Sequence, residues 1–280
     1  MLYNRKINLK VKSEKIMFED KLIVIRGAGD IATGTINRLF KCKFKILCLE
    51  SKTPSSIRRT VSYSECVYDK KCTIEDATAV LITNIEEMRD AHKNNLIPVM
   101  VDENCDILNE IKADVLIDAI IAKRNLGTNK SMAKLTIALG PGFVAGKDVD
   151  FVIETMRGHN LGRVIKEGCA LPNTGVPGLI AGRSGERVIH APASGIIKNI
   201  SKIGDIVKKD EVIAKVGDED VIASIDGLLR GLIRDGYNVK KGLKIADIDP
   251  RYEEYDNCFT ISDKARTISG GVLEAILSNI

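Results

Sequence analysis

The stretch that most constrains the fold of this chain is a short apolar run that ends in glycines, residues 22–32 (LIVIRGAGDIA). It has the pattern G-x-G-x-x-A, in which Gly27 permits a sharp turn, Gly29 lets backbone N–H groups approach a phosphate, and Ala32 allows close packing of helix on strand. A helix that begins here presents unpaired N–H donors to an anion. The stretch therefore predicts a buried strand, a tight turn and a helix start.

The residues after the glycines extend this pattern to a strand–helix–strand unit. A helical pattern covers residues 35–40, and a second apolar run, residues 44–49, ends at Glu50. An acidic residue about 20 positions after the glycines is where a dinucleotide-binding fold holds the ribose. We therefore predict a Rossmann-like unit whose cofactor-binding residues are Gly27, Ala28, Gly29, Asp30, Ile31 and Glu50. The alternative is an ordinary unit with an empty glycine turn.

Two arginines extend the predicted cofactor site. Arg58 and Arg59 follow Glu50 by eight and nine positions, and two guanidinium groups can clamp a phosphate or a carboxylate. The alternative is a solvated helix edge. Because the Glu50 carboxylate repels a 2′-phosphate, we expect any bound adenine dinucleotide to lack one.

Short apolar runs alternate with helical patterns as far as residue 118, which predicts a parallel sheet with helices on both faces. The net charge of +4 is too small to indicate nucleic-acid binding. No apolar stretch reaches the length of a membrane span. The seven cysteines include no C-x-x-C pair, which argues against a disulfide framework and a zinc knuckle and favours the cytoplasm.

Residues 195–216 and 227–248 form an internal repeat at a constant offset of 32. Each copy has a glycine, a strand, a glycine turn and a second strand, too little to bury its own apolar face. The pattern resembles the barrel-sandwich hybrid of biotinyl and lipoyl carrier domains. The joining residues 217–220 (GDED) contain no lysine, so we expect neither biotin nor lipoate and predict a structural or docking role.

The predicted fold class is thus α/β, with a Rossmann-like parallel sheet domain and a lysine-free barrel-sandwich-hybrid all-β domain. We expect residues 1–20 to be a disordered tail and consider Met17 a candidate natural start. The α/β domain covers residues 21–133, and a glycine-rich linking segment with strands covers 134–186. The all-β domain covers 187–250. In the C-terminal segment, 251–280, we expect a helix capped by Ser262, with close backbone packing at Gly270 and Gly271.

The glycine-rich segment contains the best candidates for catalysis. His159 lies between Arg157 and Arg163, and loop residues often form sites, so we predict Arg157 and His159 as catalytic residues. We expect His92 to be solvated and His190 to be structural. No catalytic triad order, H-E-x-x-H, Walker loop or metal-ligand cluster occurs in the sequence, so no metal is predicted, and whether the chain is an enzyme stays open.

Several long, irregular motifs between Leu22 and Leu277 resemble the YqeB family of the selenium-dependent molybdenum hydroxylase system of anaerobic bacteria. They include VIRGAGDIATG, SIRRTVSYSECVYD, GPGFVAGKD, ETMRGHNLGRVI and TISDKARTISGGVLEAIL. The resemblance implies a cytoplasmic accessory factor, whose partners are the hydroxylase or its other maturation factors.

Three hypotheses of function remain open from the sequence. The first is a maturation factor that binds a nucleotide-like ligand or a molybdopterin dinucleotide. The second is an oxidoreductase that uses NAD on a pathway intermediate. The third is a non-catalytic docking scaffold with an empty glycine turn.

Overall fold

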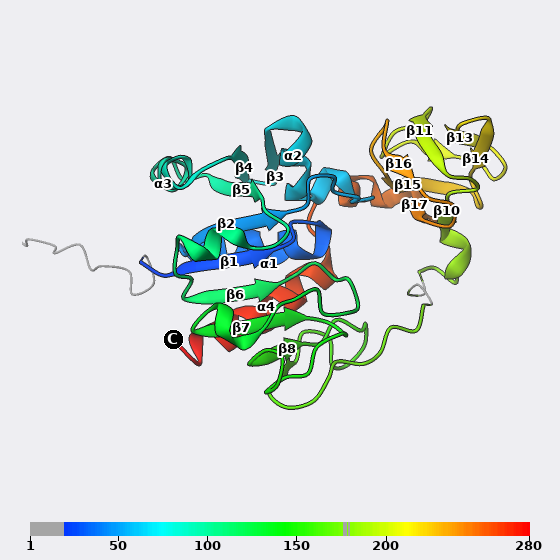
Figure 1. Cartoon of the computed structure of the whole chain (residues 1–280). Coiled ribbons are helices and arrows are strands. Elements are labelled where there is room, and N and C mark those ends of the chain that lie inside the picture. Colours follow the sequence, from blue (N-terminus) through cyan, green and yellow to red (C-terminus); the bar gives the residue numbers. More distant parts are fainter. Residues whose placement is uncertain (1–19, 176–177, 179) are drawn as a thin grey trace, which may run out of the picture.

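The computed structural model describes residues 20–175, 178 and 180–280. The predicted tail, apart from its last residue, and the candidate start at Met17 lie outside these residues. The chain forms an α/β body with a smaller β-rich lobe beside it (Figure 1). Among the described residues, no helix has the length and apolar character needed to cross a membrane.

The body is built on a nine-stranded sheet with the order β3-β4-β5-β2-β1-β6-β7-β8-β9. Seven neighbouring strands are parallel: β4 (Ala77–Ile82), β5 (Ile97–Val101), β2 (Lys45–Glu50), β1 (Leu22–Arg26), β6 (Val115–Asp118), β7 (Leu135–Leu139) and β8 (Phe151–Ile153). The edge strands β3 (Lys71–Ile74) and β9 (Val164–Ile165) are antiparallel to their neighbours.

The expected Rossmann-like parallel sheet is therefore wrong, because the sheet is mixed. The error at one edge has a local cause. Strands β3 and β4 are joined by a tight turn in which Glu75 has φ +54°. A two-residue connection can join only antiparallel strands, since a parallel pair needs a crossover of about a dozen residues or more. Glu75 carries none of the glycine or asparagine signals that normally mark such a turn.

Helices cover both faces of the sheet. Helices α1 (Asp30–Lys41) and α4 (Asp263–Leu277) lie side by side on one face (Figure 1), where Ile23 and Ile25 of β1 contact them in a continuous apolar core. On the other face, Val24 packs in a core that includes residues of α3 (Ile85–Lys93). The short helix α2 (Cys66–Asp69) lies beside β3 and β4.

The lobe consists of two four-stranded antiparallel sheets. One has the order β10-β17-β15-β12 and the other β14-β13-β11-β16. The strands are β10 (Val188–His190), β11 (Gly195–Asn199), β12 (Ile206–Val207), β13 (Val212–Val216), β14 (Glu219–Ile222), β15 (Gly227–Leu232), β16 (Asn238–Val239) and β17 (Lys244–Asp249). Each sheet contains strands of both repeat copies, since β11 pairs with β16 and β15 pairs with β12.

The lobe is fixed to the body by backbone contacts. The Leu232 N–H donates to the carbonyl of Ile57 at 2.8 Å, and the guanidinium of Arg59 donates back to the carbonyl of Leu232 at the same distance. A 3₁₀ segment, Tyr252–Cys258, then leads from β17 to α4. The chain therefore leaves the body after β9, forms the lobe, and returns to the body as α4.

Two glycines allow α4 to approach its neighbours closely. A Cβ at Gly34 of α1 would lie 2.6 Å from the carbonyl oxygen of Ala265, and a Cβ at Gly271 would overlap the carbonyl oxygen of Gly162. Ala265 and Gly271 are both buried in α4. The structure confirms the expected close backbone packing at Gly271 but not at Gly270, where the nearest atom to a Cβ is Arg38 Nη1 at 3.8 Å.

Adjacent glycines of α4 should therefore respond to alanine with opposite signs. We expect Gly271→Ala to lower the free energy of unfolding by about 1–3 kcal/mol, because the new methyl group overpacks the contact with Gly162. Gly270→Ala should raise it by about 0.5–1 kcal/mol, since alanine is the better helix former. Urea unfolding of the two variants measures both values, and a change of the same sign in both would contradict this account of the packing.

Candidate functional site

The glycine turn lies at the carboxyl end of β1 and borders a pocket of about 350 Å³. Gly27 has φ +91°, and a Cβ there would lie 3.0 Å from the carbonyl oxygen of Ala119, so this position requires glycine. Gly29 has φ −66°, and its Cβ would meet only the Ser56 hydroxyl, at 3.4 Å. The first glycine thus shapes the backbone, while the second leaves space in the pocket.

The start of α1 supplies the pocket with hydrogen-bond donors. Gly29 is the N-cap residue and makes no side-chain cap. The backbone bond from Thr33 N–H to the Gly29 carbonyl, 2.8 Å, is the first of the helix. The N–H groups of Asp30, Ile31 and Ala32 therefore have no acceptor within the helix, and all three residues line the pocket.

Glu50 forms another wall of this pocket and also holds the turn in place. Its Oε2 accepts the Ala28 N–H at 2.8 Å and its Oε1 accepts the Ser51 N–H at 2.7 Å. Burial raises the pKa of the Glu50 carboxyl, and the two backbone hydrogen bonds oppose that shift. Ala28 itself is fully buried, so its part in the turn is this hydrogen bond.

The segment that follows β6 forms the wall of the pocket opposite Glu50. A buried group of three polar side chains, Arg26, Asp118 and Thr128, holds this segment in position. The guanidinium of Arg26, only 5% exposed, donates to the Thr128 hydroxyl and lies 3.6 Å from the Asp118 carboxylate. The same hydroxyl donates to Asp118 at 2.6 Å. Burial raises the pKa of the Asp118 carboxyl. Ala119, Ile120 and Ile121, which continue from this carboxylate, give the pocket an apolar side.

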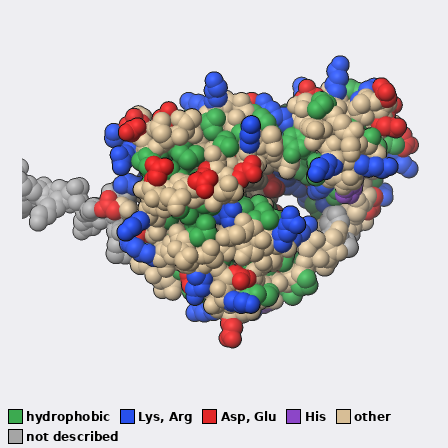
Figure 2. Space-filling model, viewed as in Figure 1, with side chains coloured by type: hydrophobic (Ala, Val, Ile, Leu, Met, Phe, Trp, Pro, Cys, Tyr) green, Lys and Arg blue, Asp and Glu red, His purple; other side chains and the backbone are tan. Residues whose placement is uncertain are grey.

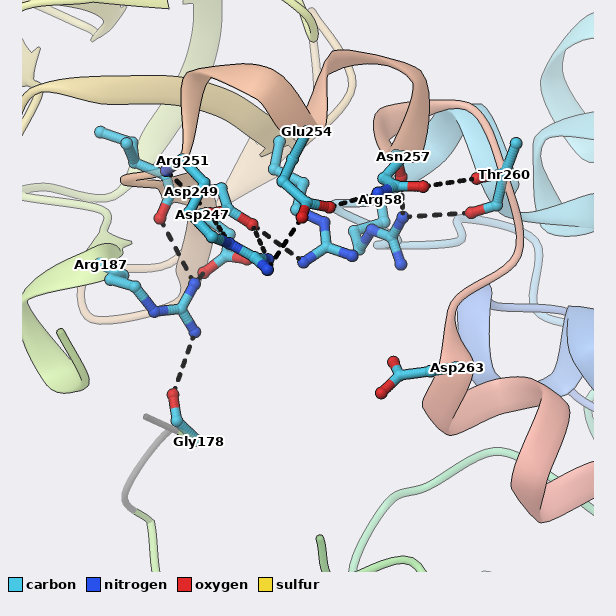
Figure 3. Close-up of polar contacts among 12 residues, drawn as sticks. Arg58, Gly178, Arg187, Asp247, Asp249, Arg251, Glu254, Asn257, Thr260 and Asp263 are labelled. Atoms are coloured by element: carbon cyan, nitrogen blue, oxygen red, sulfur yellow. Dashed lines mark hydrogen bonds and ion pairs between the residues drawn. The ribbon is translucent and has the colours of Figure 1, made fainter. Parts of the chain in front are cut away.

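The structure places Arg58 and Arg59 away from the glycine turn. The Arg58 guanidinium donates to the carbonyls of Asn257, at 2.9 Å, and Thr260, at 3.5 Å (Figure 3). Arg59 donates to the lobe through Leu232. Of the residues predicted to bind a cofactor, Gly27, Gly29, Asp30, Ile31 and Glu50 line one pocket, and neither arginine does.

A second cavity, of about 480 Å³, lies between the body and the lobe. Figure 2 shows an opening between the two with Lys and Arg side chains at its border. The charged residues that line the cavity are Arg157, Arg230, Arg251, Glu254 and Asp263. Below we call it the arginine cavity.

Arg157, one of the two predicted catalytic residues, lines this cavity, and His159 does not. The guanidinium of Arg157 donates two hydrogen bonds, of 2.8 and 3.0 Å, to the Asp263 carboxylate at the start of α4. This pairing lowers the pKa of Asp263 to about 2. His159 is exposed on the neighbouring turn. The structure therefore does not bring the two predicted catalytic residues together at one cavity.

The sequence did not indicate the lobe residues of the arginine cavity, although the segment after the repeat contains a signal for one of them. At the offset of 32, Arg251, three residues after the second copy, corresponds to Glu219, three residues after the first. Positions at which two copies of a repeat differ in charge are candidates for a role beyond the shared fold. Among the described residues, no cluster of three or more His, Cys, Asp or Glu side chains is placed to hold a metal.

Comparison with known proteins gives one relative in sequence. No family model matches the chain. The "Uncharacterized protein YqeB" of Escherichia coli K12 is 52% identical over 258 residues, which cover 92% of this chain and 47% of that protein. The chain thus spans about half the length of the relative. This similarity supports the expected membership of the YqeB family.

The solved structures that match the chain have low similarity. They include a succinylglutamate desuccinylase/aspartoacylase from Rhodobacter sphaeroides, with 15% identity over 52% of this chain and 61% of that one, and a TM-score of 0.24. An aspartoacylase family protein from Mesorhizobium loti has 10% identity over 82% and 85%, with a TM-score of 0.28. The ectoine utilization protein EutE (DoeB) from Ruegeria pomeroyi has 9% identity over 81% and 86%, with a TM-score of 0.24.

TM-scores this low carry no argument about activity. The expected class, a Rossmann-like domain with a barrel-sandwich hybrid, is corrected by the sheets of the structure itself. The chain has a mixed α/β sheet and a lobe of two antiparallel sheets, and Leu232 of this lobe is hydrogen-bonded to Ile57 and Arg59 of the body.

The two backbone hydrogen bonds that Glu50 accepts should contribute to the stability of the fold. Glutamine offers one carbonyl oxygen and turns an NH₂ group toward the other backbone N–H. We therefore expect Glu50→Gln to lower the free energy of unfolding by about 1–3 kcal/mol. Glu103→Gln is the matched control, because the exposed Glu103 carboxylate accepts one backbone N–H, that of Lys52, and should cost less than about 0.5 kcal/mol. Equal losses in denaturant unfolding would contradict the role given to Glu50.

Proposed function

We propose that this chain is an accessory factor in the maturation of a selenium-dependent molybdenum hydroxylase, and that it holds a nucleotide-like or molybdopterin dinucleotide ligand at the glycine turn. The observation that carries the proposal is the pocket in which three N–H donors of α1 lie with the Glu50 carboxylate. The pathway is what the resemblance of the sequence motifs to the YqeB family implies, and the 52% identity to YqeB supports that family. Because the relative is about twice as long, the proposal concerns the step performed by this part.

The lining groups suit the parts of a dinucleotide. The N–H groups of Asp30, Ile31 and Ala32, together with the positive end of the α1 dipole, favour a phosphate. The Glu50 carboxylate keeps acceptor capacity for sugar hydroxyls, because each of its oxygens has two lone pairs and accepts one backbone hydrogen bond. Ile120 and Ile121 offer an apolar surface to a base. A volume of about 350 Å³ lies within the range of small-ligand pockets.

A test of this site is possible because Gly29 tolerates a Cβ. We expect Gly29→Val to abolish nucleotide binding while the fold is kept, since a Cβ at this position meets only the Ser56 hydroxyl and the two methyl groups beyond it take the space of a phosphate. Calorimetry with NAD, NADP, FAD, AMP and molybdopterin-cytosine dinucleotide on both proteins measures the effect. Gly185→Val, at an exposed glycine with no atom near its Cβ, is the matched control and should bind as the parent does.

The outcomes separate the three hypotheses. A parent protein that binds none of these ligands contradicts the proposal and favours a docking scaffold. Turnover of NAD with a pathway intermediate favours an oxidoreductase. Tighter binding of NADP than of NAD contradicts the role of Glu50, whose carboxylate repels a 2′-phosphate.

The hairpin between β13 and β14 supports a docking role toward a basic partner. Asp218, Glu219 and Asp220 are all exposed there, and Asp220 is paired with Lys215 at 2.6 Å. The two carboxylates that this pair leaves available, Asp218 and Glu219, project from the lobe and attract a basic surface of the hydroxylase.

Replacing Asp218, Glu219 and Asp220 with serine should therefore weaken the association with the hydroxylase without affecting ligand binding at the glycine turn. Pull-down of the hydroxylase at low and high salt measures the first effect, and calorimetry measures the second. An association that is as strong as in the parent and has the same salt dependence would rule out this docking surface.

A further inference from the structure

At the arginine cavity, one buried carboxylate is shared between two arginines. The Asp249 carboxylate is fully buried and accepts from two arginines. It binds Arg251 through Nε and Nη2, at 2.9 and 2.8 Å, and Arg230 through Nη1 at 3.3 Å (Figure 3). Glu254 pairs with the remaining Nη1 of Arg251 at 2.9 Å. Arg251 is thus fully paired, and Arg230 has only a share of one carboxylate.

Arg58 adds a second cation beside Arg230. Its guanidinium group donates to the backbone carbonyls of Asn257 and Thr260, and both of these residues line the cavity. In the part of the chain that the structure describes, the Nε atoms of Arg58 and Arg230 are buried and make no hydrogen bond. Burial lowers the pKa of Arg58 and the charge of Arg230 lowers it further, while Asp30 and Asp247 oppose the shift. The guanidinium groups of Arg58, Arg157, Arg230 and Arg251 thus lie at or behind the cavity wall with the three carboxylates of Asp249, Glu254 and Asp263.

The side of the cavity formed by the body contains an ion pair. Arg157 is paired with Asp263, and the two side chains are 45% and 71% exposed. An exposed pair of this kind contributes little to stability, so a stronger anion can displace the carboxylate from the guanidinium.

We propose that the arginine cavity binds a phosphate-type oxyanion, which contacts Arg157 and Arg230 and takes the place of Asp263 on Arg157. This site goes beyond the function proposed above, because its lining shares no residue with the pocket at the glycine turn. The anion supplies the negative charge that Arg230 and Arg58 lack. Its arrival releases Asp263 at the start of α4.

The geometry favours a tetrahedral anion over a carboxylate. The three arginines of the lining come from separate elements: the loop after β8, strand β15 and the segment after β17. A carboxylate has two oxygens in one plane, and at Asp263 both of them accept from Arg157 alone. A phosphate has oxygens that point in several directions and so accepts from guanidinium groups on different sides at once.

Calorimetry of the full chain with inorganic phosphate and with pyrophosphate tests the proposal. We expect Arg157→Gln and Arg230→Met each to weaken binding about tenfold or more, since each removes a charge-assisted hydrogen bond. Asp263→Asn should strengthen binding several-fold, because it removes the competing carboxylate, while the Ser262 cap of α4 stays in place. Arg89→Ala, at an exposed position of α3, is the control and should bind as the parent does.

The increase in phosphate affinity expected for Asp263→Asn keeps the test decisive even if Arg230→Met does not fold. A purely structural role of the Arg157–Asp263 pair predicts no gain in affinity. The proposal is overturned if the parent binds neither anion, or if Arg157→Gln and Asp263→Asn bind as the parent does. It is also overturned if Gly29→Val abolishes phosphate binding, since the anion would then be at the glycine turn. Unchanged phosphate binding by Gly29→Val separates this site from the one proposed above.

Discussion

The close approach of α4 to the rest of the body is the contact on which the positions of both sites depend. Gly34 lets the backbone of Ala265 lie against α1. At Gly271, the carbonyl oxygen of Gly162 lies where the Cβ of any other residue would be. The N-terminus of α1 lines the pocket at the glycine turn, and the first residues of α4 line the arginine cavity. One helix-to-helix contact therefore sets the relative placement of the two.

Two kinds of charged group occur in the molecule: buried ion pairs that stabilise the fold, and arginines at the arginine cavity that outnumber their carboxylate partners. Arg26 and Asp118 form a buried pair with the Thr128 hydroxyl, and the lobe's Arg187 is paired with Asp247 at 3.2 Å (Figure 3). Each of these pairs has one carboxylate for one guanidinium group. At the arginine cavity, the guanidinium groups of Arg58, Arg157, Arg230 and Arg251 lie with the three carboxylates of Asp249, Glu254 and Asp263. This difference separates a structural ion pair from a candidate binding site.

The local part of the architecture was predictable from the sequence, because apolar runs and turn residues are local signals. The strands at residues 22–26 and 45–50 and the helix capped by Ser262 follow such signals closely. Strand β3 was missed, because only two of its four residues are apolar and its turn uses Glu75. Strand β9 has two residues, too few for any periodic pattern.

The sites were predictable only where their residues are neighbours in sequence or on adjacent strands. Gly27, Gly29 and Glu50 line one pocket because β1 and β2 pair in parallel and end at the same edge of the sheet. Arg58 was assigned to that pocket by its distance from Glu50 along the chain, but its guanidinium turns toward Asn257. The partners of Arg157 come from α4 and the lobe, about 70 to 105 residues later, and no local pattern signals that approach.

The lobe is inserted into the body between β9 and α4, and this order along the chain constrains how the protein can be made. During synthesis the sheet of the body emerges first, but the face that α4 covers stays open until the lobe and then α4 have been made. Neither repeat copy can complete a sheet alone, since each sheet needs strands of both. Contacts between distant segments form slowly, and exposed apolar surface promotes aggregation meanwhile. The nascent chain is therefore a natural client for chaperones until α4 reaches the body.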